Sequence, residues 1–252
     1  MRRPSRRIPD PELPCFGVFR VESAASLPAP SFIDDLTTAA LAVMPGFMDP
    51  FVVGALRDEI HAGRSLAGMR RAGIGRGKDR RLASAVRGDW IRWLDGSTEA
   101  QRLFLGQMEG IRQEVNQALL LGLFEVEAHF ALYPPGAGYQ RHVDAFQHDN
   151  PRRLSAVLYL NRHWRRSQGG ELAIYDAKGC ELRRVIPEAG TLVLFLSQSV
   201  PHAVLPTRRW RASIAAWFRL RQAENPLAGL ARLQPDDIAP ATADPGGFAG
   251  RR

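Results

Sequence analysis

The amino-acid sequence predicts a mainly β fold braced by helices (α+β class), built as an antiparallel sandwich or barrel of the jelly-roll kind. The first observation is that short runs of β-forming residues alternate with turn residues from about residue 125 to residue 220. The second is that two helical patterns precede these runs, where they can cover one face of a sheet. The third is that 252 residues with 45% hydrophobic content suffice for one large core.

The chain changes character near residue 46. Residues 1–45 are basic and rich in Pro, Ser and Ala without a sustained period, which predicts an N-terminal extension that is at best partly ordered. A helix then starts with Asp49 as N-cap and Pro50 as its first residue. Its apolar side chains recur at helical spacing at Phe51, Val52, Leu56 and Ile60. The Gly- and Arg-rich segment 67–81 follows, and we interpret it as a flexible loop.

The remaining elements are a strand, a long helix and six further strands. Residues 86–94 read as the first strand, and residues 98–121 as an amphipathic helix with Ser97 as N-cap. The apolar stripe of this helix comprises Leu103, Leu105, Met108, Ile111, Val115 and Leu119. The six later strands are expected at 127–133, 154–161, 170–176, 191–197, 202–206 and 212–219. Residues 223–252, rich in Pro, Ala and Gly, predict a loose C-terminal tail.

Composition narrows the function classes. A net charge of +8 and a pI of about 10.4 favour an acidic partner such as nucleic acid. Much of this charge lies in arginines at the two ends of the chain, where solvated tails are the simpler explanation. Cys15 and Cys180 are far apart and lack metal-site spacing, so we expect no disulfide framework and a reducing cytoplasm. No apolar run is long enough to span a membrane, and the N-terminus does not resemble a secretory signal.

The stretch G-Y-Q-R-H-V-D carries the first sign of chemistry. His142 and Asp144 are two residues apart, so in an extended chain their side chains point to the same face. An imidazole and a carboxylate side by side suit a divalent iron, if a second histidine completes a two-histidine, one-carboxylate set. A His-x-Asp pair also arises by chance, so the pair alone does not establish a metal site.

The second histidine is offered by His202, which opens a strand after S-Q-S-V-P. Arg211 follows nine residues later on a returning strand, and a hairpin of that size would place both side chains in one cavity. Arginine is the side chain suited to bidentate capture of a carboxylate. Taken singly, His202 is also consistent with a satisfied polar residue and Arg211 with a surface charge. The joint pattern is much more restrictive than its parts.

Five motifs, in this order, resemble those of a known family. They are V-R-G-D-W-I-R-W-L, L-Y-P-P-G-A-G-Y-Q-R-H-V-D, L-Y-L-N-R-H-W, Q-G-G-E-L-A-I-Y and P-H-A-V-L-P-T-R-R-W-R-A-S-I-A-A-W-F, between about residues 86 and 220. The chain resembles the iron(II)- and 2-oxoglutarate-dependent oxygenases, specifically the prolyl 4-hydroxylase branch with the oxygen-sensing hydroxylases and their bacterial relatives. The resemblance implies a double-stranded β-helix, a cupin-like jelly roll. It also implies a dioxygenase domain over residues 46–222 with its metal and co-substrate core over 125–220.

The resemblance also implies roles for individual residues. His142, Asp144 and His202 would bind Fe(II). Arg211 would receive the distal carboxylate of 2-oxoglutarate. Tyr159 would donate its hydroxyl to that carboxylate, and Tyr133 would hydrogen-bond the co-substrate near the metal. Each tyrosine is also consistent with a core aromatic residue whose hydroxyl is satisfied.

By the same resemblance the reaction is hydroxylation of prolyl residues in a protein or peptide, with O2 consumed, succinate and CO2 as co-products and ascorbate as reductant. The substrate mouth would be formed by Asp89, Trp93, Arg152 and Trp217, although the tryptophans are also consistent with core positions and Arg152 with a surface charge. A translation factor such as elongation factor Tu is one candidate partner. His129 stands where close relatives tend to carry an apolar residue.

Three alternatives remain open at the level of the sequence. The first is an oxygenase of the same fold acting on nucleic acid or a small molecule, supported by the basic loop 69–81. The second is a non-catalytic binding module that keeps the fold, against which the complete ligand set argues. The third is a zinc hydrolase with the same ligands, although no general base is evident beside the site.

Overall fold

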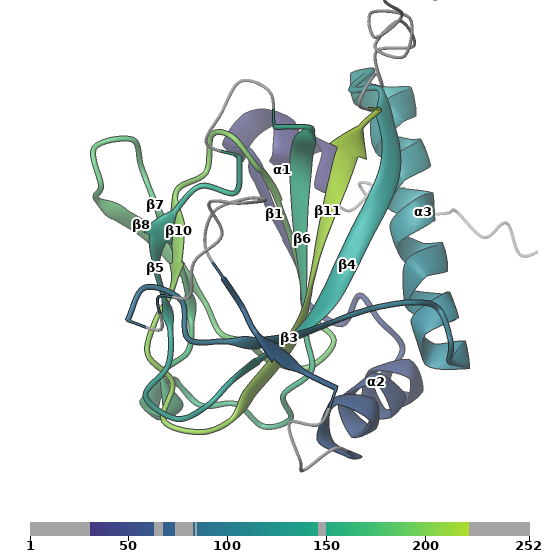
Figure 1. The fold of residues 1–252 in the computed structure, drawn as a ribbon. Coiled ribbons are helices and arrows are strands. Elements are labelled where there is room, and N and C mark those ends of the chain that lie inside the picture. The colour runs from purple at the N-terminus through teal and green to yellow at the C-terminus, as the bar shows by residue number, and fades with distance from the viewer. Residues whose placement is uncertain (1–30, 63–67, 74–82, 84, 146–149, 222–252) are drawn as a thin grey trace, which may run out of the picture. The chain divides into compact units, whose positions relative to one another are not determined.

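The computed structural model describes residues 31–62, 68–73, 83, 85–145 and 150–221, whose strands form two antiparallel sheets (Figure 1). The larger sheet has seven strands in the order β1-β9-β6-β11-β4-β3-β2. Their bounds, in that order, are Leu41–Met44, Leu192–Leu196, Arg152–Tyr159, Arg211–Leu220, Leu123–Tyr133, Trp90–Trp93 and Arg70–Arg71. The smaller sheet has the order β5-β10-β7-β8, with bounds Tyr139–His142, His202–Val204, Leu172–Tyr175 and Glu181–Val185. This arrangement is the double-stranded β-helix that the sequence predicts.

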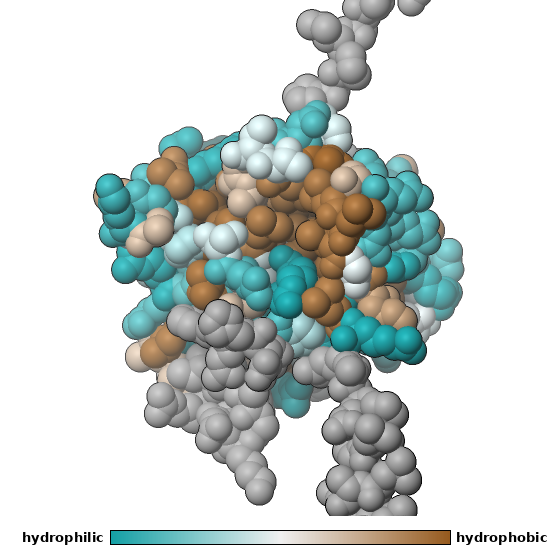
Figure 2. All heavy atoms as spheres, turned by 90° about the horizontal axis from the view of Figure 1, so that it is seen from above, coloured by the Kyte–Doolittle hydropathy of each residue, from teal (hydrophilic) through white to brown (hydrophobic). Residues whose placement is uncertain are grey.

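Within the described residues, three helices accompany the sheets, together with a short 3-10 helix, η2, at Arg166–Gln168. They are α1 (Phe32–Ala39), α2 (Pro50–Ala62) and α3 (Glu99–Leu119), and α3 lies along β4 on the right of Figure 1. In the view from above, the outward side of α3 is hydrophilic, as an amphipathic surface helix requires (Figure 2). Among the residues that the structure describes, no helix combines the length and apolar character needed to cross a bilayer.

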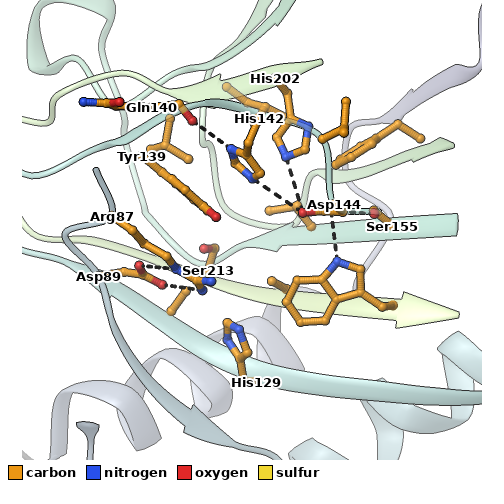
Figure 3. Close-up of a pocket in the computed structure, with 18 of the residues that line it drawn as sticks. Arg87, Asp89, His129, Tyr139, Gln140, His142, Asp144, Ser155, His202 and Ser213 are labelled. Atoms are coloured by element: carbon orange, nitrogen blue, oxygen red, sulfur yellow. Dashed lines mark hydrogen bonds and ion pairs between the residues drawn. The ribbon is translucent and has the colours of Figure 1, made fainter. Parts of the chain in front are cut away.

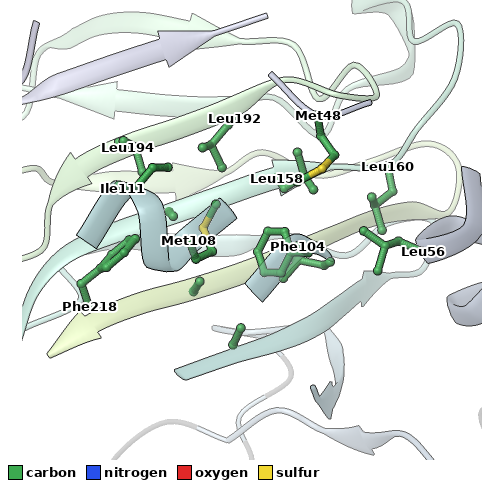
Figure 4. Close-up of a cluster of buried hydrophobic side chains, with 14 of the residues drawn as sticks. Met48, Leu56, Phe104, Met108, Ile111, Leu158, Leu160, Leu192, Leu194 and Phe218 are labelled. Atoms are coloured by element: carbon green, nitrogen blue, oxygen red, sulfur yellow. The ribbon is translucent and has the colours of Figure 1, made fainter. Parts of the chain in front are cut away.

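The main hydrophobic core lies between the helices and one face of the larger sheet. Phe104, Met108 and Ile111 of α3 and Leu56 of α2 are buried there against side chains of the sheet (Figure 4). The sheet contributes alternate residues, among them Leu158, Leu192, Leu194 and Phe218. A second cluster, which includes Val193, Phe195, Leu172 and Ile174, joins the other face to the smaller sheet. Because successive side chains of a strand point to opposite faces, the larger sheet serves a core on one face and a cavity on the other.

The sequence predicts both long helices, with small errors at their ends. Asp49 precedes α2 as expected, and its carboxylate accepts a hydrogen bond from the backbone N–H of Phe51 at 2.7 Å. In α3 the N-cap is Thr98, whose hydroxyl accepts from the backbone N–H of Gln101, so the expected cap at Ser97 is wrong by one residue. The apolar stripe shifts too, because Phe104 is buried whereas Leu103 is 46% exposed.

The structure differs from the prediction over the last part of the expected extension, residues 1–45. Residues 32–44 form α1 and β1, and β1 pairs with β9 in the larger sheet, with Leu41 opposite Phe195. The folded part therefore begins before residue 46. The segment L-A-V-M pairs with the backbone of β9, which would otherwise be an open edge of the sheet. Residues 1–30 and the tail 223–252 lie outside the described residues, as does most of the expected loop 67–81, within which β2 is formed.

Candidate metal centre

Strand alternation brings most of the predicted site residues to one cavity of about 590 Å³ between the sheets, whereas Tyr159 and Trp93 are not among its lining residues. Along β11 the cavity-lining residues are Arg211, Ser213, Ala215 and Trp217, and the residues between them, Ala212, Ile214, Ala216 and Phe218, belong to the core. Along β4 the lining residues are His129, Ala131 and Tyr133, again alternating with core residues. Polar or small side chains at every second position, between the apolar residues of the core, are thus the sequence signal of this cavity.

The three predicted metal ligands converge in this cavity (Figure 3). One donor atom from each of His142, Asp144 and His202 lies within 4.8 Å of the other two. Asp144 Oδ1 is 3.5 Å from His142 Nε2 and 3.8 Å from His202 Nε2. The two histidines are directly opposite each other across the β5–β10 pair, which places their imidazoles side by side. Asp144 follows in a bend just after β5 rather than in the strand itself.

The hydrogen bonds of the two imidazoles suit them for metal binding. His142 Nδ1 donates to the backbone carbonyl of Gln140 at 2.8 Å, and His202 Nδ1 donates to that of Val200 at 3.0 Å. A carbonyl only accepts, so each Nδ1 carries the proton and each Nε2 presents its lone pair toward Asp144. Two imidazole lone pairs and a carboxylate facing one another favour a cation between them, so the residues fit a divalent metal.

Electrostatics supports the same protonation states. Burial lowers the pKa of His202 to about 4, against an opposing effect of Asp144, so the imidazole is neutral near pH 7. Burial alone would raise the pKa of Asp144. The neighbouring His202 and His142 side chains and the Ser155 hydroxyl nevertheless hold that pKa well below its usual range. A neutral histidine and an ionised aspartate are the ligand forms that a metal requires.

Arg211 lies at the inner end of the cavity and is 1% exposed. Its Nε donates to the carbonyl of Gly170 at 2.8 Å and its Nη1 to the hydroxyl of Ser213 at 3.2 Å. Gly170 has φ +74°, and a Cβ there would lie 3.1 Å from Arg211 Cδ, so glycine allows the close approach. No carboxylate among the described residues forms an ion pair with Arg211. A buried guanidinium of this kind fits an anionic ligand.

Arg211 and His202 do not share a hairpin, which corrects the expectation from the sequence. β10 belongs to the smaller sheet and β11 to the larger one, so the chain crosses from one sheet to the other between them. Both side chains still line the same cavity, from opposite walls. The nine-residue spacing therefore reflects a crossover around the cavity rather than a pair of neighbouring strands.

The two predicted co-substrate tyrosines flank Arg211. The Arg211 guanidinium carbon is 5.0 Å from the ring centre of Tyr133 and 5.1 Å from that of Tyr159. Burial raises the pKa of Tyr159 to about 12, with Arg211 opposing, and burial raises the pKa of Tyr133 as well. Both phenols are therefore protonated donors at neutral pH. The Tyr159 hydroxyl is buried and has no hydrogen-bond partner among the described residues, which fits a bound acceptor beside Arg211.

The four predicted mouth residues are placed differently from one another. Arg152 and Trp217 line the cavity together, with the guanidinium carbon 3.7 Å from the indole ring centre. Asp89 also lines the cavity, but its carboxylate is engaged by Arg87 at 2.8 and 3.1 Å. Trp93 is not among the lining residues; it is 41% exposed and contacts His129 edge to face.

The structure adds site residues that the sequence analysis missed. Tyr139 stacks on the His142 ring with 3.6 Å between ring centres. The guanidinium carbon of Arg87 lies over the Tyr139 ring, 4.9 Å from the ring centre. Ser155 and Ser197, both buried, lie behind Asp144. The sequence signal for these two residues is a serine within an apolar strand, because a hydroxyl that faces inward needs a polar partner.

Comparisons with known proteins agree with this site. Residues 128–219 match the family model described as the 2OG-Fe(II) oxygenase superfamily. A Pseudomonas putida prolyl-4-hydroxylase is 42% identical with a TM-score of 0.68, over 76% of this chain and 98% of that one. A prolyl hydroxylase from Trichoplax adhaerens, solved with a peptide fragment of the hypoxia inducible factor oxygen degradation domain, is 22% identical with a TM-score of 0.66, over 75% and 87%.

A third similar structure is the viral collagen prolyl hydroxylase of Paramecium Bursaria Chlorella virus-1, solved as a 2OG complex, which is 17% identical with a TM-score of 0.53, over 73% and 98%. At this identity and that of the Trichoplax enzyme, the likeness shows the fold.

The fold, the ligand set and the similarity to the Pseudomonas enzyme together define a class. The chain belongs to the 2OG-Fe(II) oxygenase superfamily and is a 2-oxoglutarate-dependent dioxygenase. Within that superfamily it is an oxygenase of the prolyl-4-hydroxylase type.

Proposed function

We propose that this enzyme hydroxylates prolyl residues of a protein or peptide, with Fe(II) held by His142, Asp144 and His202. One oxygen atom of O2 enters a C–H bond of the proline. The other enters 2-oxoglutarate, which loses CO2 and leaves as succinate. The iron, when bound, supplies the oxidising chemistry. The observation that carries the proposal is the 42% identity over 98% of the Pseudomonas putida prolyl-4-hydroxylase.

The chain's own residues account for binding the co-substrate. Arg211, buried and without a carboxylate partner among the described residues, receives the distal carboxylate of 2-oxoglutarate. The Tyr159 hydroxyl donates to that carboxylate, and Tyr133 donates to the co-substrate nearer the metal. Around them the cavity lining holds four arginines, Arg87, Arg141, Arg152 and Arg211, and two aspartates, Asp89 and Asp144. This excess of positive charge favours a dianionic co-substrate.

The outer part of the cavity provides the substrate mouth. Arg152 and Trp217 form a stacked wall, and Glu127 holds the guanidinium of Arg152 at 2.8 Å through Nε. Asp89, fixed by Arg87, also lines the cavity, and Trp93 contacts the lining residue His129 edge to face. An aromatic wall of this kind suits a prolyl ring and excludes water from the reacting C–H bond.

The test follows succinate formation from 2-oxoglutarate by NMR, in air, with Fe(II) and with ascorbate as reductant. We expect slow turnover alone and faster turnover with cell extract or with a proline-containing protein, for which elongation factor Tu is a first candidate translation factor. Mass spectrometry of the stimulating protein should find a proline heavier by one oxygen atom. His142→Ala should abolish both signals, because it removes a metal ligand.

The matched control is His61→Ala, an exposed histidine on α2, which should turn over at the wild-type rate. A different outcome is iron-dependent succinate formation that is stimulated by extract whose proteins have been digested but whose nucleic acids remain. That result would identify a nucleic acid, rather than a prolyl residue, as the substrate. That second candidate is favoured by the exposed arginines of β2, Arg70 and Arg71, and it predicts binding that weakens steeply with salt. Iron binding without any turnover would contradict the proposed reaction altogether.

A further inference from the structure

The two carboxylate oxygens of Asp144 have different surroundings (Figure 3). Oδ1 faces the imidazoles, 3.5 Å from His142 Nε2 and 3.8 Å from His202 Nε2. Oδ2 points the other way and accepts two hydrogen bonds, from the Ser155 hydroxyl at 2.6 Å and from the Trp217 indole N–H at 2.9 Å. One oxygen is thus free to bind a metal and the other is committed to the protein.

The Ser155 hydroxyl is itself supported. It lies 2.8 Å from the hydroxyl of Ser197, and both residues are buried, at 1% and 0% exposure. Ser155 has a single hydroxyl proton, which it donates to Asp144, so Ser197 must be the donor to Ser155. Hydrogen bonds in such a chain polarise one another, and the Ser155 hydroxyl becomes a stronger donor to the carboxylate.

Two of the three donors stand on adjacent strands of the larger sheet, and the third follows the end of a neighbouring strand. Ser155 of β6 is directly opposite Trp217 of β11, and cross-strand partners point to the same face. Ser197 follows the end of β9, the other neighbour of β6, and its carbonyl also accepts from the backbone N–H of Ala145 at 3.1 Å. The sheet therefore fixes both the backbone after Asp144 and the outer oxygen of its side chain.

We propose that Ser155, Ser197 and Trp217 are positioning residues that make Asp144 a one-oxygen ligand. This inference rests on the proposed role of Asp144 as a metal ligand. A two-histidine, one-carboxylate set leaves the opposite face of the metal open only if each residue occupies one position. A carboxylate that turned to bind through both oxygens would close one of the open positions. The two hydrogen bonds to Oδ2 oppose that rotation.

The test measures binding of Co(II), used alone as a probe, to the purified full chain without 2-oxoglutarate. Ser155→Ala and Trp217→Phe should each weaken Co(II) binding roughly 10-fold, within the usual range for residues that orient metal ligands. The visible absorption bands of bound Co(II), which respond to the number of ligands, should change as well. Trp217→Phe keeps an aromatic side chain but removes the N–H donor together with the five-membered ring of the indole.

Ser197 gives a sharper test because it acts only through Ser155. Ser197→Ala should weaken Co(II) binding in the wild type, but should have no further effect in the Ser155→Ala background. Additive losses in the double variant would mean that Ser197 does not act through Ser155. Ser213→Ala is the matched control, because this cavity hydroxyl bonds Arg211 rather than Asp144, and its Co(II) affinity should stay within about 2-fold of wild type.

The outcomes separate this inference from the proposed function. Wild-type Co(II) affinity and wild-type spectra in both Ser155→Ala and Trp217→Phe would overturn the positioning role and leave the metal site intact. A wild-type chain that binds no Co(II), or binds it unchanged by His142→Ala, would overturn the metal role and the positioning role with it. Circular dichroism establishes that each variant is folded, and the two donors lie on different strands, so one unfolded variant leaves the other as the test.

Discussion

At the residue scale, burial sets the charge of two histidines that have different neighbours. Burial lowers the pKa of His129, as it does that of His202, to about 4. His129 Nδ1 donates to the carbonyl of Phe130 at 3.1 Å, which leaves Nε2 as an acceptor. The ring stands between Trp93 and Trp217, and Arg87 and Arg152 nearby further lower its pKa while Asp89 raises it. At neutral pH it is therefore an uncharged side chain of the cavity wall.

His129 makes a prediction about stability and pH. Its folded pKa of about 4 lies below the ordinary value of 6.5, so the unfolded chain takes up the proton first as the pH falls. Keeping His129 neutral in the folded protein therefore costs no stability above pH 6.5. As the pH falls from 6.5 toward 4, protonation of this side chain in the unfolded chain progressively lowers the free energy of unfolding. Between pH 7 and pH 5 the loss from this group is about 2 kcal/mol. Denaturant unfolding of the metal-free protein at both pH values measures it.

His129→Leu should show a smaller fall in unfolding free energy between pH 7 and pH 5, by about 2 kcal/mol. Leu103→Ala, which alters an exposed side chain of α3 that carries no titratable group, should fall as much as wild type. An equal fall in wild type and His129→Leu would show that His129 is not held neutral in the folded protein.

The sequence predicts which residues form the candidate site better than it predicts the contacts that hold them in place. His142, Asp144, His202 and Arg211 follow a spacing that indicates one site, and the structure brings them to one cavity. Their fixed orientation depends on partners such as Val200, Ser155 and Ser197, which come from other strands. These contacts follow from register between strands, and a single sequence does not specify register across long loops.

At the element scale, the apolar face of α3 is shifted by one residue from the predicted one, and this shift changes which side chain enters the core. Phe104 is fully buried against the larger sheet, whereas its neighbour Leu103 is 46% exposed. Phe104→Ala should lower the free energy of unfolding by about 3–5 kcal/mol, because it opens a cavity in the core. Leu103→Ala should change it by no more than about 0.5 kcal/mol. Denaturant unfolding of the two variants measures the contrast, and similar losses would mean that α3 packs through a different face.

The strands that could be predicted are the apolar ones. β4, β6, β9 and β11 have alternating or continuous apolar residues, which come from contact with the core. β8, with the sequence E-L-R-R-V, is exposed over its first four residues, so hydrophobic pattern does not reveal it. β1 lies in a stretch whose composition resembles an extension, and only its pairing with β9 makes it a strand.

At the scale of the whole molecule, the candidate metal centre joins the two sheets. His142 and His202 belong to β5 and β10 of the smaller sheet, whereas the outer oxygen of Asp144 is held by β6 and β11 of the larger one. A bound metal would therefore connect the two sheets and stabilise the folded state as a whole. At a concentration 100 times its dissociation constant, a metal that binds only the folded state adds about 2.7 kcal/mol.

This prediction is checked by unfolding the protein with Co(II) and with excess chelator. We expect the chelator to remove the added stability and His142→Ala to show none in either condition. An unchanged unfolding free energy at saturating Co(II) would mean that the ion binds the unfolded chain equally well, or not at all.

The hydrogen bond from Trp217 to Asp144 has a practical consequence. An indole whose N–H donates to a ligand carboxylate lies close enough to a bound paramagnetic ion for its excited state to be quenched. Its emission should therefore fall as the ion enters, and Trp217→Phe should remove most of that change while the other tryptophans keep emitting. We therefore expect Trp217 to serve as an intrinsic optical reporter, by which occupancy of the centre could be followed in real time without a label.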